Sequence, residues 1–138
     1  MSAHTARFRS LSSWFAIVLL MVAGVSLSGC RTAPVRDIGP TPTQTRTSAD
    51  DVRKEILAAG ASLGWVMKEQ SPGLIVGTLA LRTHLAVVEI PYNTSSFSIR
   101  YKDSQNLKYN AADKTIHSNY NGWVENLNNT IVARLSAL

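Results

Sequence analysis

Residues 97–102, Phe97-Ser98-Ile99-Arg100-Tyr101-Lys102, decide how this chain folds. Apolar and polar side chains alternate along the whole stretch, and a period of two is typical of a β-strand with one buried and one wet face. Sheets with a wet face are usually antiparallel, because parallel crossovers cover both faces. The stretch therefore predicts an antiparallel sheet with one solvent-exposed face.

Three segments before this strand also favour an extended backbone. In chain order they are residues 65–70, residues 74–82 and residues 85–90, and turn-forming residues separate them. The connections are too short to hold parallel crossovers. We therefore expect an antiparallel meander of about four strands.

A first amphipathic helix is predicted before the meander. Ser48 has the form of an N-cap, and Asp50 and Asp51 place negative charge in the first turn, where the helix dipole favours it. Apolar residues then recur at intervals of three and four, which predicts a helix over residues 49–62. Gly64 is the expected place for the chain to leave this helix.

A second helix is predicted after the meander. An apolar stripe with the same spacing begins near Ser118 or Asn119 and runs almost to Leu138. Two amphipathic helices and a one-sided sheet bury each other's apolar surface when both helices lie on the same face. We expect residues 48–138 to form one small α+β domain with the order α-β-β-β-β-α.

The first 29 residues have the three parts of a secretory leader. Arg7 and Arg9 give a positively charged start, residues 14–25 form an apolar core, and small residues precede the expected cut. A helix needs about 20 apolar residues to cross a bilayer, so this core is short for a membrane span. We therefore expect residues 1–29 to be a removable signal peptide.

The leader ends in Leu27-Ser28-Gly29-Cys30, which contains the chain's only cysteine. These residues resemble the lipobox of bacterial lipoproteins, and the resemblance implies cleavage after Gly29 and a diacylglyceryl group on the Cys30 sulfur. Two or three acyl chains hold a protein on a membrane almost permanently, whereas one chain binds marginally. An uncleaved membrane anchor, or an ordinary leader with an incidental cysteine, is the alternative.

Arg31 follows the cysteine where an Asp would stand in a lipoprotein kept at the inner membrane. In lipoproteins of the enterobacterial kind, that difference implies export to the outer membrane. The resemblance therefore predicts a lipid-anchored protein on the periplasmic face of the outer membrane.

Residues 30–47 have the composition of a tether behind the lipidated cysteine. Three prolines lie among polar residues, and Val35 and Ile38 are the only large apolar ones, so the segment can bury little surface. A flexible chain of this length averages about 20–25 Å from end to end. We expect a mobile tether that lets the domain stand clear of the lipid headgroups.

The composition limits the classes of partner. The chain has 138 residues and a formal net charge of +5, which falls to +3 without Arg7 and Arg9 of the leader. A charge that small, spread along the chain, is weak support for an anionic partner. Nucleic acid is not expected for an exported protein. The expected partners are the membrane, through the lipid on Cys30, and an envelope protein.

The last forty residues carry a second resemblance. Its positions are Tyr101, Ser104, Asn106, Leu107, Tyr109, Ile116, His117, Tyr120, Asn121, Trp123, Val124 and Leu127. The pattern resembles small proteobacterial lipoproteins of uncharacterised function. It implies the α+β fold described above and supplies no activity.

Few residues have the spacing of a chemical site. His84 and His117 lack the partners that a zinc site of about four ligands needs, so no metal or cofactor is predicted. Ser104, His117 and Asp113 could form a catalytic triad, which is recognised by geometry and not by spacing. The chain has no Gly-x-Ser-x-Gly elbow, and small domains rarely build a deep pocket.

A binding surface is the better supported site. Arg100 and Lys102 lie with Ser98 on the predicted wet face of the sheet, and Tyr109 is the best candidate for an exposed aromatic contact. The basic strand face could meet anionic lipid, lipopolysaccharide or a protein, and Tyr109 could contact a glycan or a peptide. An ordinary solvated surface is the alternative. An unpaired strand at the sheet edge could also accept a strand from another chain.

The sequence thus predicts a cell-envelope lipoprotein whose small α+β domain binds a partner as an accessory or assembly factor and is not an enzyme. One alternative is a small envelope hydrolase that uses Ser104, His117 and Asp113. The other is a purely structural lipoprotein.

Overall fold

The computed structural model of the chain describes residues 31–43 and 47–138. Its elements, in chain order, are β1 (Thr32–Pro34), β2 (Ile38–Pro42), α2 (Ala49–Ser62), β3 (Val66–Ser71), β4 (Leu74–Leu81), β5 (His84–Pro91), β6 (Ser96–Gln105), β7 (Thr115–His117) and α3 (Ser118–Leu135). The expected signal peptide and the lipobox with Cys30 lie outside the described residues. No helix in the described part is long and apolar enough to cross a membrane.

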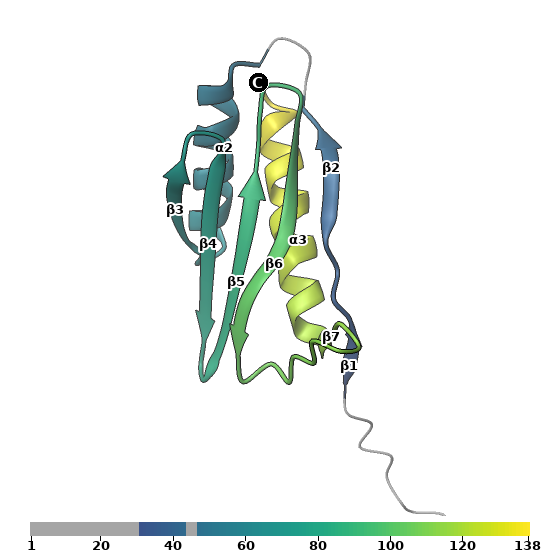
Figure 1. Cartoon of the computed structure of the whole chain (residues 1–138). Helices are drawn as coiled ribbons and strands as arrows, with labels where there is room; N and C mark the ends of the chain where they lie inside the picture. The colour runs from purple at the N-terminus through teal and green to yellow at the C-terminus, as the bar shows by residue number, and fades with distance from the viewer. Residues whose placement is uncertain (1–30, 44–46) are drawn as a thin grey trace, which may run out of the picture.

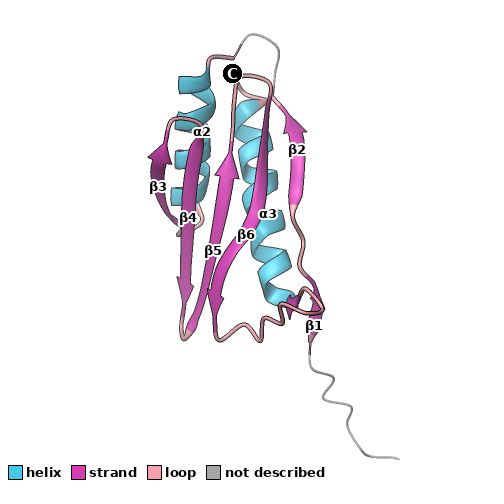
Figure 2. Ribbon diagram, in the orientation of Figure 1, coloured by secondary structure: helices cyan, strands magenta, loops and turns pink. Residues whose placement is uncertain are grey.

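The described elements form a two-layer α+β domain (Figure 1). An antiparallel five-stranded sheet has the order β2-β6-β5-β4-β3, and β1 pairs with β7 in a separate two-stranded sheet. Both helices lie on the same face of the large sheet (Figure 2). The predicted α+β class with an antiparallel sheet is confirmed, and β3 to β6 form the predicted meander.

Helix α2 has the predicted bounds because its end signals are local. The Ser48 hydroxyl accepts a hydrogen bond from the Asp51 backbone N–H at 3.1 Å, which satisfies one of the free donors of the first turn. Gly64 has a φ of +83°, a conformation that glycine adopts freely, and it lets the chain leave the helix. The Trp65 N–H then donates a hydrogen bond to the Gly60 carbonyl at 2.9 Å, so the first strand of the meander, β3, starts directly beside the end of the helix.

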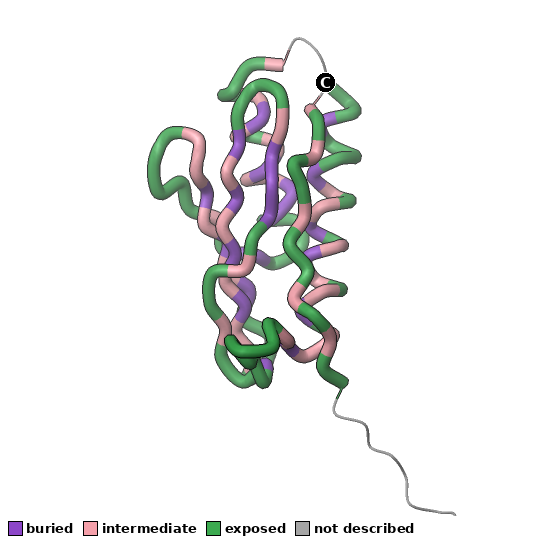
Figure 3. Tube along the Cα trace, turned by 45° about the vertical axis from the view of Figure 1, so that its right-hand side comes forward, coloured by how far each residue is buried: buried purple, intermediate pink, exposed green. Residues whose placement is uncertain are grey.

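The core lies between the helices and the sheet (Figure 3). Its largest fully buried side chains are Tyr120, Phe97, Ile56, Ile75, Ile90, Ile99, Leu107, Ile116, Leu127 and Ile131. The apolar stripes of α2 and α3 thus face the inward side chains of β4, β5 and β6, as the periodicity predicted.

The segment predicted as a mobile tether is mostly part of the fold. It is extended, but β2 pairs with β6 through Ile38 opposite Ile99, and β1 pairs with β7. The prolines are tolerated because an edge strand needs hydrogen bonds on one side only. Val35 and Ile38 pack against the core, so the folded unit begins before Ser48, and the expected domain boundary there is wrong.

Polar side chains also fix this N-terminal segment. The Asn121 side chain on α3 donates to the Pro34 carbonyl at 2.8 Å and accepts from the Arg36 N–H at 3.0 Å. Asp37 accepts a hydrogen bond from the Tyr101 backbone N–H at 2.8 Å. These bonds hold the segment that connects β1 to β2, which lies outside both sheets.

One residue of the predicted wet face is covered. Ser98 is 8% exposed, because β2 passes beside it. A Cβ atom at Gly39 would lie 2.7 Å from the Ser98 hydroxyl oxygen, so only glycine allows this approach. The expectation that Ser98 faces solvent is therefore wrong.

Candidate binding surface

The face of the large sheet that the helices leave uncovered is the main candidate surface, and we name it the open face. Strand register places alternate residues of β3 to β6 on it, opposite the buried positions. Its members are Val66, Lys68, Gln70, Leu74, Val76, Thr78, Ala80, Leu85, Val87, Glu89, Arg100, Lys102, Asp103 and Gln105.

Strands β4 and β5 supply apolar side chains to both of their faces. On β4, Ile75 and Leu79 are buried under the helices, while Leu74 and Val76 point to the open face and are half-buried there only by their neighbours. On β5, Val88 is fully buried and Val87 points outward. Near-continuous apolar runs are typical of strands covered on both faces, yet here one face has no cover within the described chain.

The edge of the open face is formed by β3. Its Val66 side chain is 69% exposed, the largest exposure of any large apolar residue in the described chain. A hollow of about 250 Å³ follows this edge, lined by Val66, Lys68, Glu69, Gln70, Val76 and Thr78. The opposite edge, β2, carries Pro40 and Pro42, whose missing N–H groups weaken any further strand pairing.

Charged groups lie at both sides of the open face, on β5 and β6 and on the β3 edge. Lys102 forms an ion pair with Glu89 across β5 and β6. Arg100 and Lys68 are exposed and form no ion pair with any described residue. The face therefore offers two unpaired positive charges beside an apolar strip.

The three residues predicted as one binding surface are divided by the structure. Arg100 and Lys102 lie on the open face, as expected. Tyr109 is 40% exposed, but its ring stacks on Tyr101 with centroids 4.3 Å apart. Because Tyr101 also meets the buried Tyr120 edge to face, Tyr109 belongs to the helix side. A single surface of Arg100, Lys102 and Tyr109 is therefore not formed.

The three residues proposed as a triad each bond to other groups. The Ser104 hydroxyl lies 2.9 Å from the Tyr101 hydroxyl, and Asp113 accepts from the Asn110 side chain at 2.9 Å. His117 Nδ1 accepts from the Asn119 backbone N–H at 3.2 Å and thereby caps α3. No hydrogen bond joins two of the three residues in the described chain, so the structure does not assemble this hydrolase site.

The two histidines are neighbours but not a cluster of ligands. The His84 and His117 rings are 6.3 Å apart, and His84 Nδ1 is 2.9 Å from the Asn106 carbonyl oxygen. Within residues 31–43 and 47–138, no group of three or more His, Cys, Asp or Glu residues is arranged to hold a metal ion.

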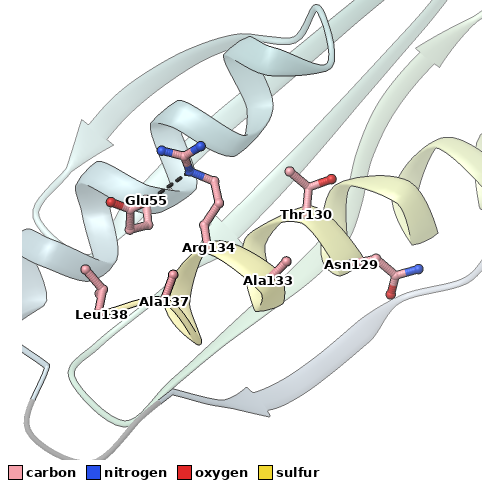
Figure 4. A pocket seen from close by; sticks show the side chains of 7 residues that line it. All are labelled: Glu55, Asn129, Thr130, Ala133, Arg134, Ala137 and Leu138. Carbon is pink, nitrogen blue, oxygen red and sulfur yellow. Dashed lines mark hydrogen bonds and ion pairs between the residues drawn. The ribbon is translucent and has the colours of Figure 1, made fainter.

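A larger hollow lies between α2 and α3, on the side away from the sheet (Figure 4). It measures about 520 Å³ and is lined by Glu55, Asn129, Thr130, Ala133, Arg134, Ala137 and Leu138. Figure 4 shows Arg134 reaching from α3 to α2, where its Nε lies 2.7 Å from a Glu55 oxygen. The charges of this hollow thus neutralise each other, which leaves little to recognise a ligand.

A third hollow, of about 370 Å³, lies at the N-terminal end of α2. Arg53 bonds Asp50 at 2.6 Å and lies 3.5 Å from Glu69, which also accepts from the Tyr92 hydroxyl at 3.1 Å. Hydrogen bonds from Lys54 and Arg53 lower the pKa of Asp50, while burial raises the pKa of Tyr92. These groups satisfy one another and brace α2 against β3.

The apolar half of the open face could not be predicted from the sequence. Val66, Val76 and Val87 were placed in strands, but apolar neighbours on both sides concealed which of them point outward. The available signal was the nearly continuous apolar run of residues 74–81, in which Thr78 is the only side chain that carries a polar group.

No protein-family model matches this chain, and neither does any curated protein or solved structure.

Proposed function

We propose that the chain is a lipoprotein of the bacterial outer membrane, anchored through Cys30, whose domain binds an extended segment of a partner protein at the open face. The observation that carries the binding proposal is the apolar strip of β4 and β5, which no described element covers. Exposed apolar surface beside polar groups is typical of a protein interaction site.

The partner segment would add to the sheet at β3. This edge has free backbone donors and acceptors over six residues, and it has no proline. A strand added there would receive hydrogen bonds from the backbone, while its alternate side chains would enter the hollow beside Val66. Lys68, which lies on β3 itself and has no ion-pair partner among the described residues, favours acidic residues in that segment.

Site-specific photocrosslinking in the producing cells tests this proposal. A photoreactive amino acid replaces Val66, Lys68 or Gln70 in turn, and Val132 serves as the matched control, because it is an exposed valine on α3, away from the sheet. We expect the β3 positions to give one common protein adduct and Val132 to give none. Absence of an adduct at all three β3 positions would contradict partner binding at this edge.

Intact mass measurement tests the anchor separately. A mature chain that begins at Cys30 and carries the mass of a diacylglyceryl group is expected. A free thiol, with residues 1–29 still attached, would disprove the lipoprotein assignment and leave the binding experiment to be judged by itself.

A further inference from the structure

The first described residue, Arg31, is held directly against the domain. Its carbonyl oxygen accepts from the Ser118 backbone N–H at 2.7 Å, and Thr32 pairs with His117. Neighbouring Cα atoms in a chain are about 3.8 Å apart. A lipid on Cys30 would therefore join the chain next to β1, with no spacer between the anchor and the fold.

Three segments meet at this end of the molecule, and we name them together the anchored end: Arg31, the β4–β5 turn (residues 81–84) and the β6–β7 loop (residues 106–114). Figure 1 shows β1, the turn and the loop at the same end. The Asn106 side chain donates to the Thr83 carbonyl at 2.6 Å, and the His117 N–H donates to the Leu107 carbonyl at 2.8 Å. The three segments form one connected surface.

The anchored end is rich in unpaired positive charge. Its cations are Arg31, Arg82, Lys108 and Lys114, all of them exposed, and its one carboxylate is Asp113. None of the four cations forms an ion pair with a described residue. By contrast, ion pairs hold five other cations of the described chain, namely Arg36, Arg53, Lys54, Lys102 and Arg134.

Two large side chains are exposed beside these charges. Leu81 is 41% exposed and Tyr109 is 40% exposed. An amphipathic aromatic ring and an aliphatic side chain among cations suit the boundary between headgroups and acyl chains, where tyrosine is enriched.

The backbone of the same cations is unusual. Arg82, Lys108 and Lys114 have φ values of 55°, 51° and 49°. Residues other than glycine, asparagine and aspartate rarely adopt this left-handed conformation, and glycine would adopt it without strain. Fold stability alone would favour glycine at these positions, so the long cationic side chains need another reason.

We propose that the anchored end rests on the anionic phospholipid headgroups of the membrane that holds the lipid on Cys30. This inference rests on the proposed lipidation. The strands of the large sheet then point away from the bilayer surface. The β3 edge remains accessible to a partner protein in this orientation. The earlier expectation of a domain raised on a flexible tether is replaced by a domain held upright on its own basic end.

Hydrogen exchange of the lipidated chain in vesicles tests the inference. Vesicles of phosphatidylcholine are compared with vesicles that also contain phosphatidylglycerol, and residues 133–138 at the far end serve as the internal reference. We expect amides of residues 81–84 and 106–114 to exchange about tenfold more slowly on the anionic vesicles, and high salt to remove the difference. If these amides exchange equally fast on both kinds of vesicle, whether quickly or slowly, the inference is overturned.

Paired variants separate charge from folding. Lys108→Gly with Lys114→Gly removes two cations and relieves backbone strain, so the melting temperature should not fall while the lipid-dependent protection is lost. Lys54→Gln with Arg134→Gln removes the same charge from the helices and should keep the protection. Retained protection in the glycine variant would overturn the inference, and if that variant does not fold, the comparison of vesicles with the natural chain decides.

The intact mass of the same sample distinguishes the two proposals. A chain without lipid on Cys30 overturns both the lipoprotein assignment and this inference. A lipidated chain whose anchored end exchanges equally on the two kinds of vesicle overturns this inference alone.

Discussion

The two faces of the five-stranded sheet are built from similar side chains but have different surroundings. Beneath the helices, Ile75 of β4 and Val88 of β5 are fully buried. On the open face, Val76 and Val87 of the same two strands have only their sheet neighbours around them. Residue type therefore predicts that a position belongs to a strand, whereas the packing of the helices determines which face of the sheet is buried. The covered face should carry most of the stability, and the open face should be free for binding.

The largest difference is expected between two adjacent valines of β5. Val88→Ala should lower the free energy of unfolding by about 2 kcal/mol, because it leaves a cavity at a fully buried site. Val87→Ala, the matched control on the open face, should cost less than about 1 kcal/mol. Urea denaturation measures both, and equal losses would mean that the two faces are equally well packed.

A buried hydroxyl on the covered face gives a prediction of opposite sign. Tyr120 is fully buried, its hydroxyl has no hydrogen-bond partner in the described chain, and burial raises its pKa. Tyr120→Phe should therefore raise the free energy of unfolding by about 1 kcal/mol.

The matched control for this change is Tyr101→Phe. The Tyr101 hydroxyl bonds to the Ser104 hydroxyl at 2.9 Å, so its removal should cost about 1 kcal/mol. Thermal denaturation of both variants is the measurement. A loss of stability in Tyr120→Phe would show that the buried hydroxyl has a stabilising partner after all.

The covered face also depends on helix α2 forming at its predicted start. Ser48→Ala removes the side-chain acceptor for the Asp51 N–H and should cost about 1 kcal/mol. Ser48→Asn keeps an acceptor and should cost far less. Circular dichroism during thermal denaturation compares the two variants, and equal melting temperatures would contradict a role for the cap.

The smallest effect is expected on the open face. The ion pair of Lys102 and Glu89 is about one third exposed on each side, so water screens it. A double-mutant cycle of Lys102→Ala and Glu89→Ala should give a coupling of about 0.5 kcal/mol that disappears in high salt. A coupling of several kcal/mol would mean that this part of the face is as dry as the covered side.

Elements with local signals were predictable from the sequence. Helix α2 has the bounds that the Ser48 cap and its apolar spacing predicted, and α3 begins at Ser118, one of the two expected starts. The four strands of the meander were also found, because each carries several β-forming residues between turns.

The short strands β1, β2 and β7 were not predictable in the same way. Three to five residues show no period, and the prolines among them resemble a linker. What makes them strands is distant: Ile38 lies opposite Ile99, and Ala33 lies opposite Ile116. A reading based on local composition does not include such partners.

The candidate site was predictable only in its charged part. Arg100 and Lys102 alternate with buried residues, so their outward direction follows from the pattern. Tyr109 is 40% exposed, as predicted, but its stacking on Tyr101 depends on the path of the loop after β6 and has no signal in the sequence.

The attachment of the first strands to the last helix sets an order of events during folding. Pro34 and Asn121 are 87 positions apart in the chain, yet a hydrogen bond joins them. Ribosomal synthesis and any passage through a narrow channel deliver the N-terminal residues first, long before their partners exist. Contacts so distant in sequence close slowly, so we expect β1 and β2 to dock last. Until they dock, the β6 edge that β2 occupies in the folded domain would be open to pairing with other chains.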